Sequence, residues 1–317
     1  MELDCLSVGL LVADHLCAPI AQLPRAGQLV LTDHLLLNIG GCASNAAMDL
    51  ARLGVKVGVV GCVGADVFGR FVIETLESAG IESSTIRRLA GVGTSGTLIV
   101  NVAGEDRRFI HSVGANGKLT AADIPLDRAR RAKVFYVGGY LLMPSLDQDE
   151  LAALFRQARA AGVTTVLDVA LPGPGDHWSK LERLLPETDV FLPNDDEAAL
   201  ITGLADPCRQ AERFHEAGAR TVAITCGGRG TVLVSDGLRV EAGVYPVDYV
   251  GATGAGDAFD AGYIAGLIEG GDPLRCLEWG SALGASCVRS IGATDSVFDR
   301  AQAEEFMRTH KLKITSW

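Results

Sequence analysis

Short apolar runs alternate with longer segments of helical periodicity along most of the chain. The first run, residues 5–12, predicts a buried strand, and residues 42–53 predict a helix that ends at Gly54. Alternation on this scale predicts right-handed crossovers and a mostly parallel sheet with helices on both faces. Further strands are predicted at 57–63, 134–137, 163–168, 190–192 and 221–225, and further helices at 66–79, 146–161, 194–202, 208–217, 254–269 and 273–290.

Two regions break this alternation, at residues 18–39 and 91–113, which are too polar and too strand-like for crossover helices. Within the second, residues 97–102 and 107–112 flank the turn-forming residues 103–106, which is a hairpin signature. We therefore predict a small β-sheet that closes over a substrate as a lid, with a plain edge hairpin as the alternative. Residues 1–317 are predicted to form a single α/β domain, a three-layer α/β/α sandwich carrying this lid.

Composition and charge narrow the class of protein. The 317 residues are 48% hydrophobic, enough to bury the core of one large domain. The net charge of −11 argues against nucleic acids and anionic membranes as partners, although a small anionic ligand stays compatible with it. No basic segment precedes the first apolar run and no stretch is long enough to span a bilayer, so we expect a cytoplasmic protein. Eight cysteines without C-x-x-C or zinc spacing predict reduced, mostly buried thiols.

The most informative stretch is residues 251–259, with the sequence G-A-T-G-A-G-D-A-F. Small residues at the start of an apolar helix bring backbone N–H groups together, and such a helix N-terminus binds anions. Phosphoryl transfer needs charge stabilisation and a proton acceptor, which these amides and Asp257 can supply. The alternative is that Asp257 simply favours a first helical turn. The helix N-terminus is also expected to lower the pKa of Asp257, giving a weak base suited to late proton transfer.

Two common nucleotide-binding motifs do not apply to this sequence. The chain contains no G-x-x-x-x-G-K-[ST] sequence, which excludes a P-loop. Residues 91–96 spell G-x-G-x-x-G, but they lead into a predicted strand where the dinucleotide motif requires a helix. We interpret that match as chance.

Several motifs resemble those of one family. Residues 253–257 strongly resemble the C-terminal signature of the ribokinase-like carbohydrate kinases, also called the PfkB family. Residues 40–45, followed by A-R-L-G at 51–54, resemble its N-terminal signature. These motifs occur in family order over nearly the whole chain, together with N-x-x-E at 194–197, T-x-G-x-x-G at 225–230, and the familiar segments 63–69 and 114–116.

The resemblance implies a ribokinase-like fold and an ATP-dependent kinase that phosphorylates a hydroxyl of a small sugar, with ATP and Mg²⁺ as cofactors. It also implies a homodimer formed through the lid. Carried over by position, Asp257 would be the base within an anion hole of Gly254, Ala255 and Gly256. Glu197 and Asn194 would organise Mg²⁺; Asn194, Thr225, Gly227, Gly230 and Thr253 would line the ATP site; and Asp14, Gly40, Gly41 and Asn45 would bind substrate hydroxyls.

Several of these positions have structural alternatives. Asn194 and Glu197 have the spacing of a helix capping box. Asp14 could be an exposed loop acid, although an acid after a buried strand also lies at the strand's carboxyl end, where ligands bind. Asn45 could be an ordinary helix residue and Thr225 a strand-end residue, and the two glycines at 40–41 a simple turn.

The chain also departs from the family pattern. Many members of the family have an Asp at the position of Gly251, and in some of them this Asp helps to bind an activating monovalent cation. Dependence on that cation is therefore doubtful for this chain. Residues 168–172 lack the Asn and Arg of many sugar-acid kinases. Two other functions stay open. One is a nucleoside kinase, which needs an apolar or aromatic slot for the base; Phe109 is the one clear aromatic candidate in the predicted lid. The other is a catalytically silent ligand sensor. The retained Asp257 and Glu197 argue against the sensor.

Overall fold

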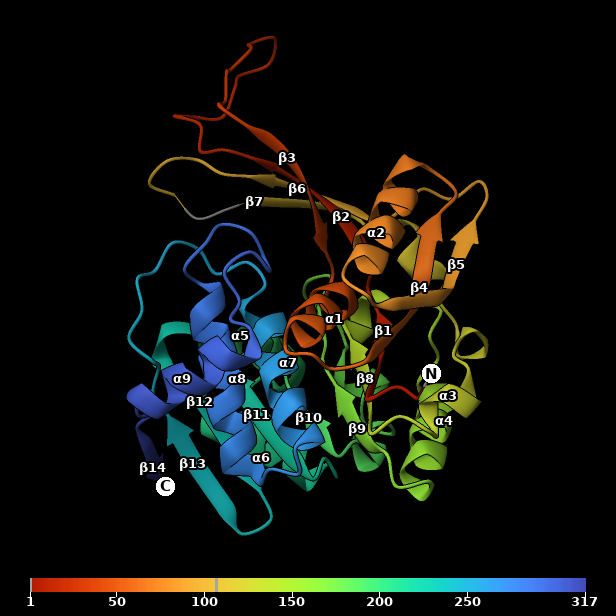
Figure 1. The fold of residues 1–317 in the computed structure, drawn as a ribbon, viewed down its shortest axis with the longest axis vertical. Helices are drawn as coiled ribbons and strands as arrows, with labels where there is room; N and C mark the ends of the chain where they lie inside the picture. Colours follow the sequence, from red (N-terminus) through yellow and green to blue (C-terminus); the bar gives the residue numbers. More distant parts are fainter. Residues whose placement is uncertain (1, 106–107) are drawn as a thin grey trace.

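A ten-stranded sheet runs through the protein, and a four-stranded sheet projects from one end of it (Figure 1). The computed structural model describes residues 2–105 and 108–317. Seven neighbouring strands of the large sheet, from β11 to β5 in the order below, are parallel, and the remaining three, β12, β13 and β14, pair antiparallel. In spatial order the strands are β14 (Ile314–Ser316), β13 (Leu238–Ala242), β12 (Thr231–Ser235), β11 (Thr221–Thr225), β10 (Val190–Phe191), β9 (Thr164–Leu167), β8 (Val134–Gly138), β1 (Cys5–Gly9), β4 (Val57–Gly64) and β5 (Glu82–Leu89).

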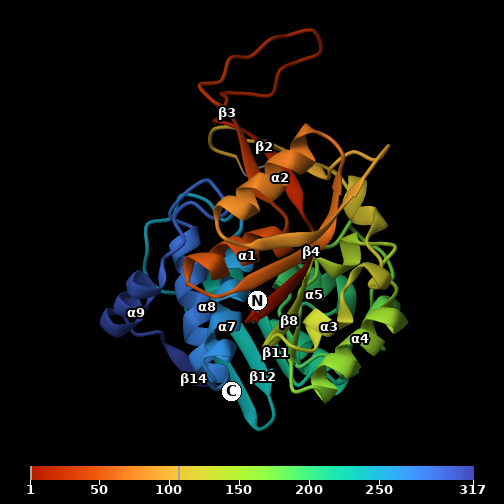
Figure 2. The same ribbon diagram turned by 45° about the vertical axis from the view of Figure 1, so that its right-hand side comes forward.

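Helices cover both faces of the large sheet, and each face has its own hydrophobic core. The helices fall into two groups, named at the end of this paragraph, and the side chains of each group pack in a different core. This arrangement, with helices on both sides of the sheet (Figure 2), confirms the predicted three-layer α/β/α sandwich. Among the described residues, no helix is both long and apolar enough to cross a membrane. The first group is α1 (Cys42–Arg52), α2 (Val67–Ser78), α7 (Ala255–Ile268), α8 (Pro273–Cys287) and α9 (Arg300–Thr309), and the second is α3 (Leu126–Ala129), α4 (Gln148–Ala160), α5 (Asp195–Thr202) and α6 (Pro207–Glu216).

The small sheet is the predicted lid. Its strands lie in the order β3 (Leu35–Gly40), β2 (Val12–Cys17), β6 (Gly96–Val100) and β7 (Arg108–Ser112). Strands β6 and β7 form the predicted antiparallel hairpin. Asp106 and Arg107, which the hairpin prediction included, lie outside the described residues.

Two sequence predictions about this region are wrong. The apolar run 5–12 is not one strand: β1 ends at Gly9, and the chain then enters the lid as β2. Gly9 has φ 143°, a conformation that favours glycine. The side chain of Asn116 also binds both the N–H and the C=O of Leu11, at 3.1 and 3.0 Å. The chain therefore leaves the large sheet without a polar break in its sequence, and residues 18–39 supply only β3 of the lid.

The other missed strands lie at the two ends of the large sheet. Strand β5 mixes polar and apolar residues and is only partly buried, so it has no apolar run to mark it. Strands β12 and β13 form a hairpin after β11 where the sequence analysis assigned no element. These omissions leave the parallel centre of the sheet, which carries the site, unaffected.

Candidate active site

The candidate site lies along one edge of the large sheet, where its parallel strands end. Asp168 directly follows β9, Asn194 lies three residues after β10, and Thr225 is the last residue of β11. Asn194 and Thr225 also pair with each other through a β-bridge. Ligands of open α/β sheets bind at this carboxyl edge. Residues scattered over the sequence are thereby brought to one place.

The predicted glycine loop opens α7. Gly254 caps the helix with φ 77°, and a Cβ there would lie 2.5 Å from the backbone oxygen of Ala293, so only glycine fits. The amide of Ala255 already donates to the carbonyl of Ala252 at 3.2 Å. Of the three amides predicted as an anion hole, those of Gly254 and Gly256 are therefore the better candidates.

Asp257 lies in the first turn of α7 and meets α1. The Nδ2 of Asn45 donates to its Oδ2 at 2.7 Å, across 212 residues of sequence. Burial raises the pKa of Asp257, while hydrogen bonds from Asn45 and Cys42 oppose the rise. The expectation of a lowered pKa is wrong, because burial has the largest effect on this carboxyl and raises its pKa. A raised pKa makes Asp257 the stronger base.

Asp14 points into the site from lid strand β2. Its side chain is buried rather than an exposed loop acid, and Oδ1 has no hydrogen-bond partner. Burial raises its pKa to about 6; a hydrogen bond from Thr97 opposes the rise and Asp257 adds to it. A Cβ on Gly40 would lie 2.0 Å from Asp14 Oδ2, so a glycine is needed for this approach. Asp14 is thus close enough to Asp257 for their charges to interact, so a residue predicted to bind substrate lies near the predicted base.

Asn194 and Glu197 form the capping box that the sequence analysis gave as their alternative role. Asn194 Oδ1 accepts from the Glu197 amide at 2.8 Å, and Glu197 Oε2 accepts from the Asn194 amide at 3.0 Å. The pKa of Glu197 is nevertheless raised to about 8, first by burial; hydrogen bonds from Asn194 oppose the rise and Asp257 adds to it. Capping and a place in the site are therefore compatible.

The remaining predicted ATP-site residues follow the next strand and the α7 loop. Thr225 is followed by a single helical turn from Gly227 to Arg229, and Gly230 leads into β12. Thr253 directly precedes the cap of α7, and its buried Oγ1 has no hydrogen-bond partner. A buried hydroxyl without a partner beside a helix N-terminus suits an anionic ligand group.

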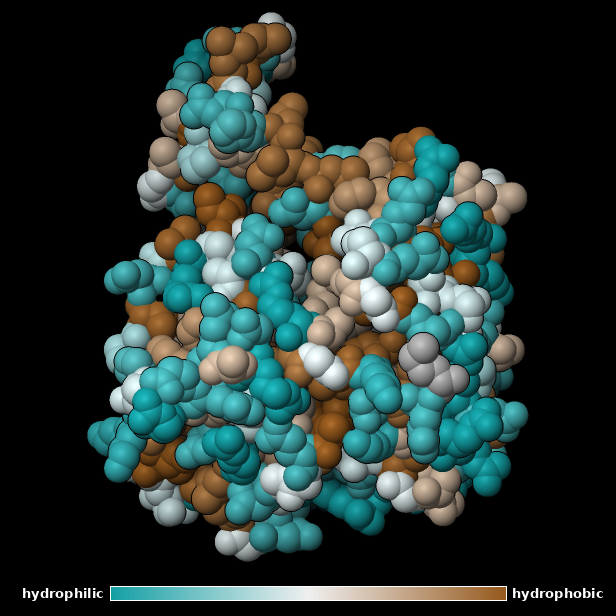
Figure 3. All heavy atoms as spheres, in the orientation of Figure 1, coloured by the Kyte–Doolittle hydropathy of each residue, from teal (hydrophilic) through white to brown (hydrophobic). Residues whose placement is uncertain are grey.

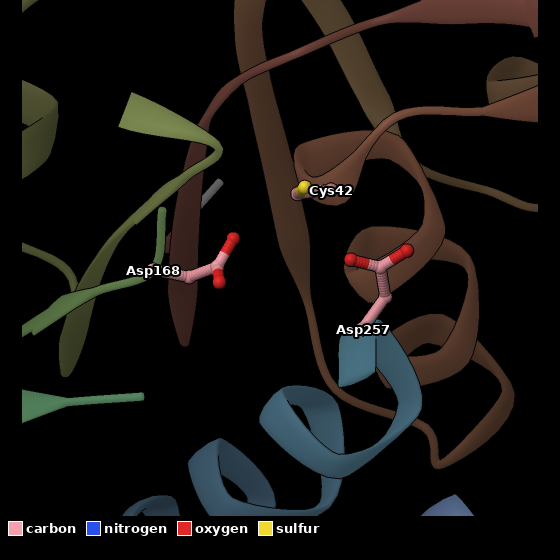
Figure 4. Close-up of side chains that lie close together, drawn as sticks. All are labelled: Cys42, Asp168 and Asp257. Atoms are coloured by element: carbon pink, nitrogen blue, oxygen red, sulfur yellow. The ribbon is translucent and has the colours of Figure 1, made fainter. Parts of the chain in front are cut away.

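Two residues of the site were missed from sequence. One ligand atom each from Cys42, Asp168 and Asp257 lies within 4.8 Å of the others. Figure 4 shows Asp168 facing the first turns of α1 and α7, which carry Cys42 and Asp257. Asp168 is an acid directly after a buried strand, the same signal that drew attention to Asp14. Cys42 carries no comparable signal, because its place follows from how α1 packs against α7.

Comparison with known proteins identifies the family. The family model "pfkB family carbohydrate kinase" matches residues 3–300. The chain belongs to the pfkB family of carbohydrate kinases. The resemblance found in the ordered motifs is thus confirmed, as is the prediction that the protein is a carbohydrate kinase.

Relatives of this pfkB-family kinase agree in fold and differ in substrate. The chain is 28% identical to the ribokinase of Haemophilus influenzae, over 95% of its own length and 97% of the relative's. It is 27% identical to a 5-dehydro-2-deoxygluconokinase of Clostridium perfringens, covering 86% and 85% of the two chains. A solved structure of Arabidopsis thaliana ribokinase with ribose and ATP superposes with a TM-score of 0.83 at 24% identity, covering 97% and 99%. The predicted ribokinase-like fold is therefore confirmed.

Proposed function

We propose that this kinase transfers the γ-phosphoryl group of ATP to a hydroxyl of a small sugar, with Asp257 as the base. The observation that carries the proposal is the buried meeting of α1 and α7. There Asn45 holds the Asp257 carboxylate beside the glycine loop, and Asp14 adds an unpaired acceptor from the lid. The Arabidopsis relative that was solved with ribose and ATP supports the same pair of ligands.

The transfer assigns each group a step. Asp14 and Asn45 hold the acceptor through their hydroxyl-binding oxygens, and the acceptor oxygen attacks the γ-phosphorus as its proton passes to Asp257. The bond from the γ-phosphorus to ADP breaks, and the amides of Gly254 and Gly256 hold the transferring group. Closure of the lid sheet over the acceptor would exclude water and suppress ATP hydrolysis.

Glu197 and Asn194 are proposed to organise Mg²⁺, which when bound neutralises charge on the ATP phosphates. The donor set fits this ion, since carboxylate and amide oxygens are the hard ligands that Mg²⁺ prefers, often through waters. The raised pKa of Glu197 reflects burial and the nearby Asp257, so a bound cation would relieve an existing repulsion. A monovalent-cation requirement is not proposed, because glycine at position 251 brings no carboxylate there. Turnover is expected to be equal in potassium and in tetramethylammonium at the same ionic strength.

The lid suits a second copy of the chain as its partner. Its edge strand β3 exposes Leu35, Leu36 and Leu37 in succession, and with Leu98 of β6 they border an apolar hollow. Figure 3 shows hydrophobic side chains gathered on the lid above the main body. We expect a homodimer by light scattering, converted to monomer by Leu36→Glu and unaffected by the exposed control Leu200→Glu. A monomeric wild type would contradict this assembly.

A screen for ADP release tests the proposed function. Wild-type protein, MgATP and a panel of sugars, sugar derivatives and nucleosides are combined, and ADP formation above the acceptor-free rate is measured. We expect stimulation by at least one sugar. ADP formation that no acceptor stimulates, or stimulation by nucleosides alone, would contradict the proposal.

A further inference from the structure

Asp168 is a carboxyl with a fixed direction in the candidate site, close to Asp257. The residue is 8% exposed, and the amide of Gly139 donates to its Oδ2 at 2.9 Å. Its backbone N–H and C=O are bonded to the end of β8 and to the residues after it. The carboxylate is thereby held between two strand ends, facing Cys42 and Asp257 (Figure 4).

The part of the site around Asp257 offers mainly hydrogen-bond acceptors. Oδ1 of Asp14 and Oδ1 of Asn45 are buried acceptors without a donor, and Asp168 and Asp257 add further carboxyl oxygens. The Nδ2 donor of Asn45 is already used by Asp257. A ligand hydroxyl or ammonium can donate to such atoms, whereas a ligand carboxylate or phosphate only accepts. The lining therefore calls for a ligand rich in donors.

The charged groups around Asp257 also favour a ligand without an anionic group. Among the described residues, no cation acts on the pKa of Asp14 or of Asp257. Burial has the largest effect on the pKa of Asp168, and the nearby Glu197 and Asp257 raise that pKa further. A ligand anion placed here would add a further negative group to carboxyls that are desolvated and already raise one another's pKa, which is unfavourable.

We propose that the phosphoryl acceptor is a polyol without an anionic group, either a neutral sugar or an amino sugar, and that Asp168 is a specificity-determining residue that excludes sugar acids and sugar phosphates. This inference rests on the proposed kinase function and names its substrate class. It sets this chain apart from its 5-dehydro-2-deoxygluconokinase relatives, whose name denotes an acid acceptor.

Matched acceptors test the substrate class. Five- and six-carbon sugars are each compared with the corresponding aldonic acid, 2-amino sugar and terminal phosphate ester, by kcat/KM in the ADP-release assay. We expect the neutral or amino form of the active sugar to exceed its acid and phosphate forms by about a hundredfold or more, from like-charge repulsion. Comparison of kcat/KM for the amino sugar and the neutral sugar then shows whether the site prefers an ammonium or a hydroxyl donor. An acid or phosphate form that equals or exceeds its neutral parent overturns the proposal.

Asp168→Asn tests the assigned residue. The amide oxygen can still accept from Gly139, so the strand junction is retained while the ionisable carboxyl is removed. We expect the ratio of kcat/KM for the acid over the neutral form to rise about tenfold, through acceptor KM, with the KM for ATP unchanged. The control Asp149→Asn, at an exposed position on α4, should leave the ratio unchanged. An unchanged ratio in a folded Asp168→Asn or Asp168→Ser protein overturns the role of Asp168.

Binding separates this inference from the kinase proposal. The same acceptor pairs are titrated calorimetrically into protein that holds a non-hydrolysable ATP analogue. If no acceptor stimulates ADP release but the neutral or amino form binds more tightly than its acid, the kinase function fails and the ligand class stands. Tighter binding of the acid, or binding of none of the compounds, overturns the ligand class whatever the turnover.

Discussion

The central sheet and the lid sheet approach the same site, but the sequence equips them in opposite ways. Every residue of β4 and of β8 is buried, whereas every residue of β7 and the first three of β3 are exposed. The central sheet carries two cores and holds its site residues at strand ends packed on both faces. The lid buries little apolar surface of its own, yet it buries the carboxylate of Asp14.

This difference suggests a division of labour. In the proposed mechanism, the groups fixed by the central sheet and by α7 carry out phosphoryl transfer, because the chemistry requires positions that do not change. The lid has little core to hold it in one place, so its order should depend on the acceptor or on a partner copy. Breaking a central group should therefore lower kcat, and breaking a lid group should weaken binding of the acceptor.

The largest effect is expected at Asp257. Asp257→Asn keeps the shape and removes the proton acceptor, so kcat should fall by about two to four orders of magnitude. ATP binding should persist, as measured by calorimetry. Asp260→Asn is the matched control: this buried acid, one turn further along α7, accepts from Tyr136 and should retain most activity. A near wild-type kcat in Asp257→Asn would remove Asp257 from the mechanism.

A smaller effect is expected at the lid. Asp14→Ala removes a charged hydrogen bond to the acceptor, which is worth roughly 1.5–3 kcal/mol, or about 10- to 150-fold in acceptor affinity. The KM for ATP should change little. Asp33→Ala, at an exposed lid position, serves as the control. If Asp14→Ala weakens ATP and spares the acceptor, the two ligands are placed at the wrong ends of the site.

The Mg²⁺ requirement of the proposed metal site should depend on pH. Mg²⁺ binding favours the ionised form of Glu197, whose pKa is raised to about 8, so protons compete with the metal below that pH. The Mg²⁺ concentration for half-maximal activity should fall as the pH rises towards 8. Glu197→Gln should raise this concentration several-fold and flatten its pH dependence, while the control Glu216→Gln, at an exposed position on α6, should not. An unchanged Mg²⁺ titration with reduced thermal stability would leave Glu197 only its capping role.

Asp49, in the central region, is a carboxyl that costs stability. Asp49 of α1 is fully buried, neither carboxylate oxygen has a partner, and burial raises its pKa well above the ordinary value. A folded-state pKa above the unfolded value means that stability is lost as the pH rises from about 4 towards the folded pKa. Asp49→Ala should stabilise the protein by about 1–3 kcal/mol near neutral pH, and the gain should shrink towards pH 4. Denaturant unfolding at several pH values measures this, and a destabilised Asp49→Ala at pH 8 would contradict it.

The two regions also differ in how far the sequence predicts them. Buried parallel strands are predictable because each is a short apolar run, and β8 and β11 fall where the pattern places them. The start of the lid is not predictable from the sequence, because the apolar run continues through the turn after Gly9. That turn depends on Asn116, which lies 105 residues away from Leu11.

The site divides along similar lines. Asp14, Asn45 and Asp257 are recognisable because each belongs to a motif or follows a strand. The place of Cys42 and the direction of the pKa shift of Asp257 depend on the packing of α1 against α7, which no local pattern encodes. Asp168 carries a local signal, but its role depends on which groups face it across the site.

The most direct test of the central claim follows the phosphorus itself. Wild-type protein, MgATP and the best neutral or amino acceptor are incubated and observed by ³¹P NMR. The account predicts that the γ-phosphate signal of ATP is replaced by a phosphomonoester signal of the acceptor, in equal amount to the ADP formed. Formation of ADP with inorganic phosphate and no ester, or no loss of ATP with any acceptor, would contradict it.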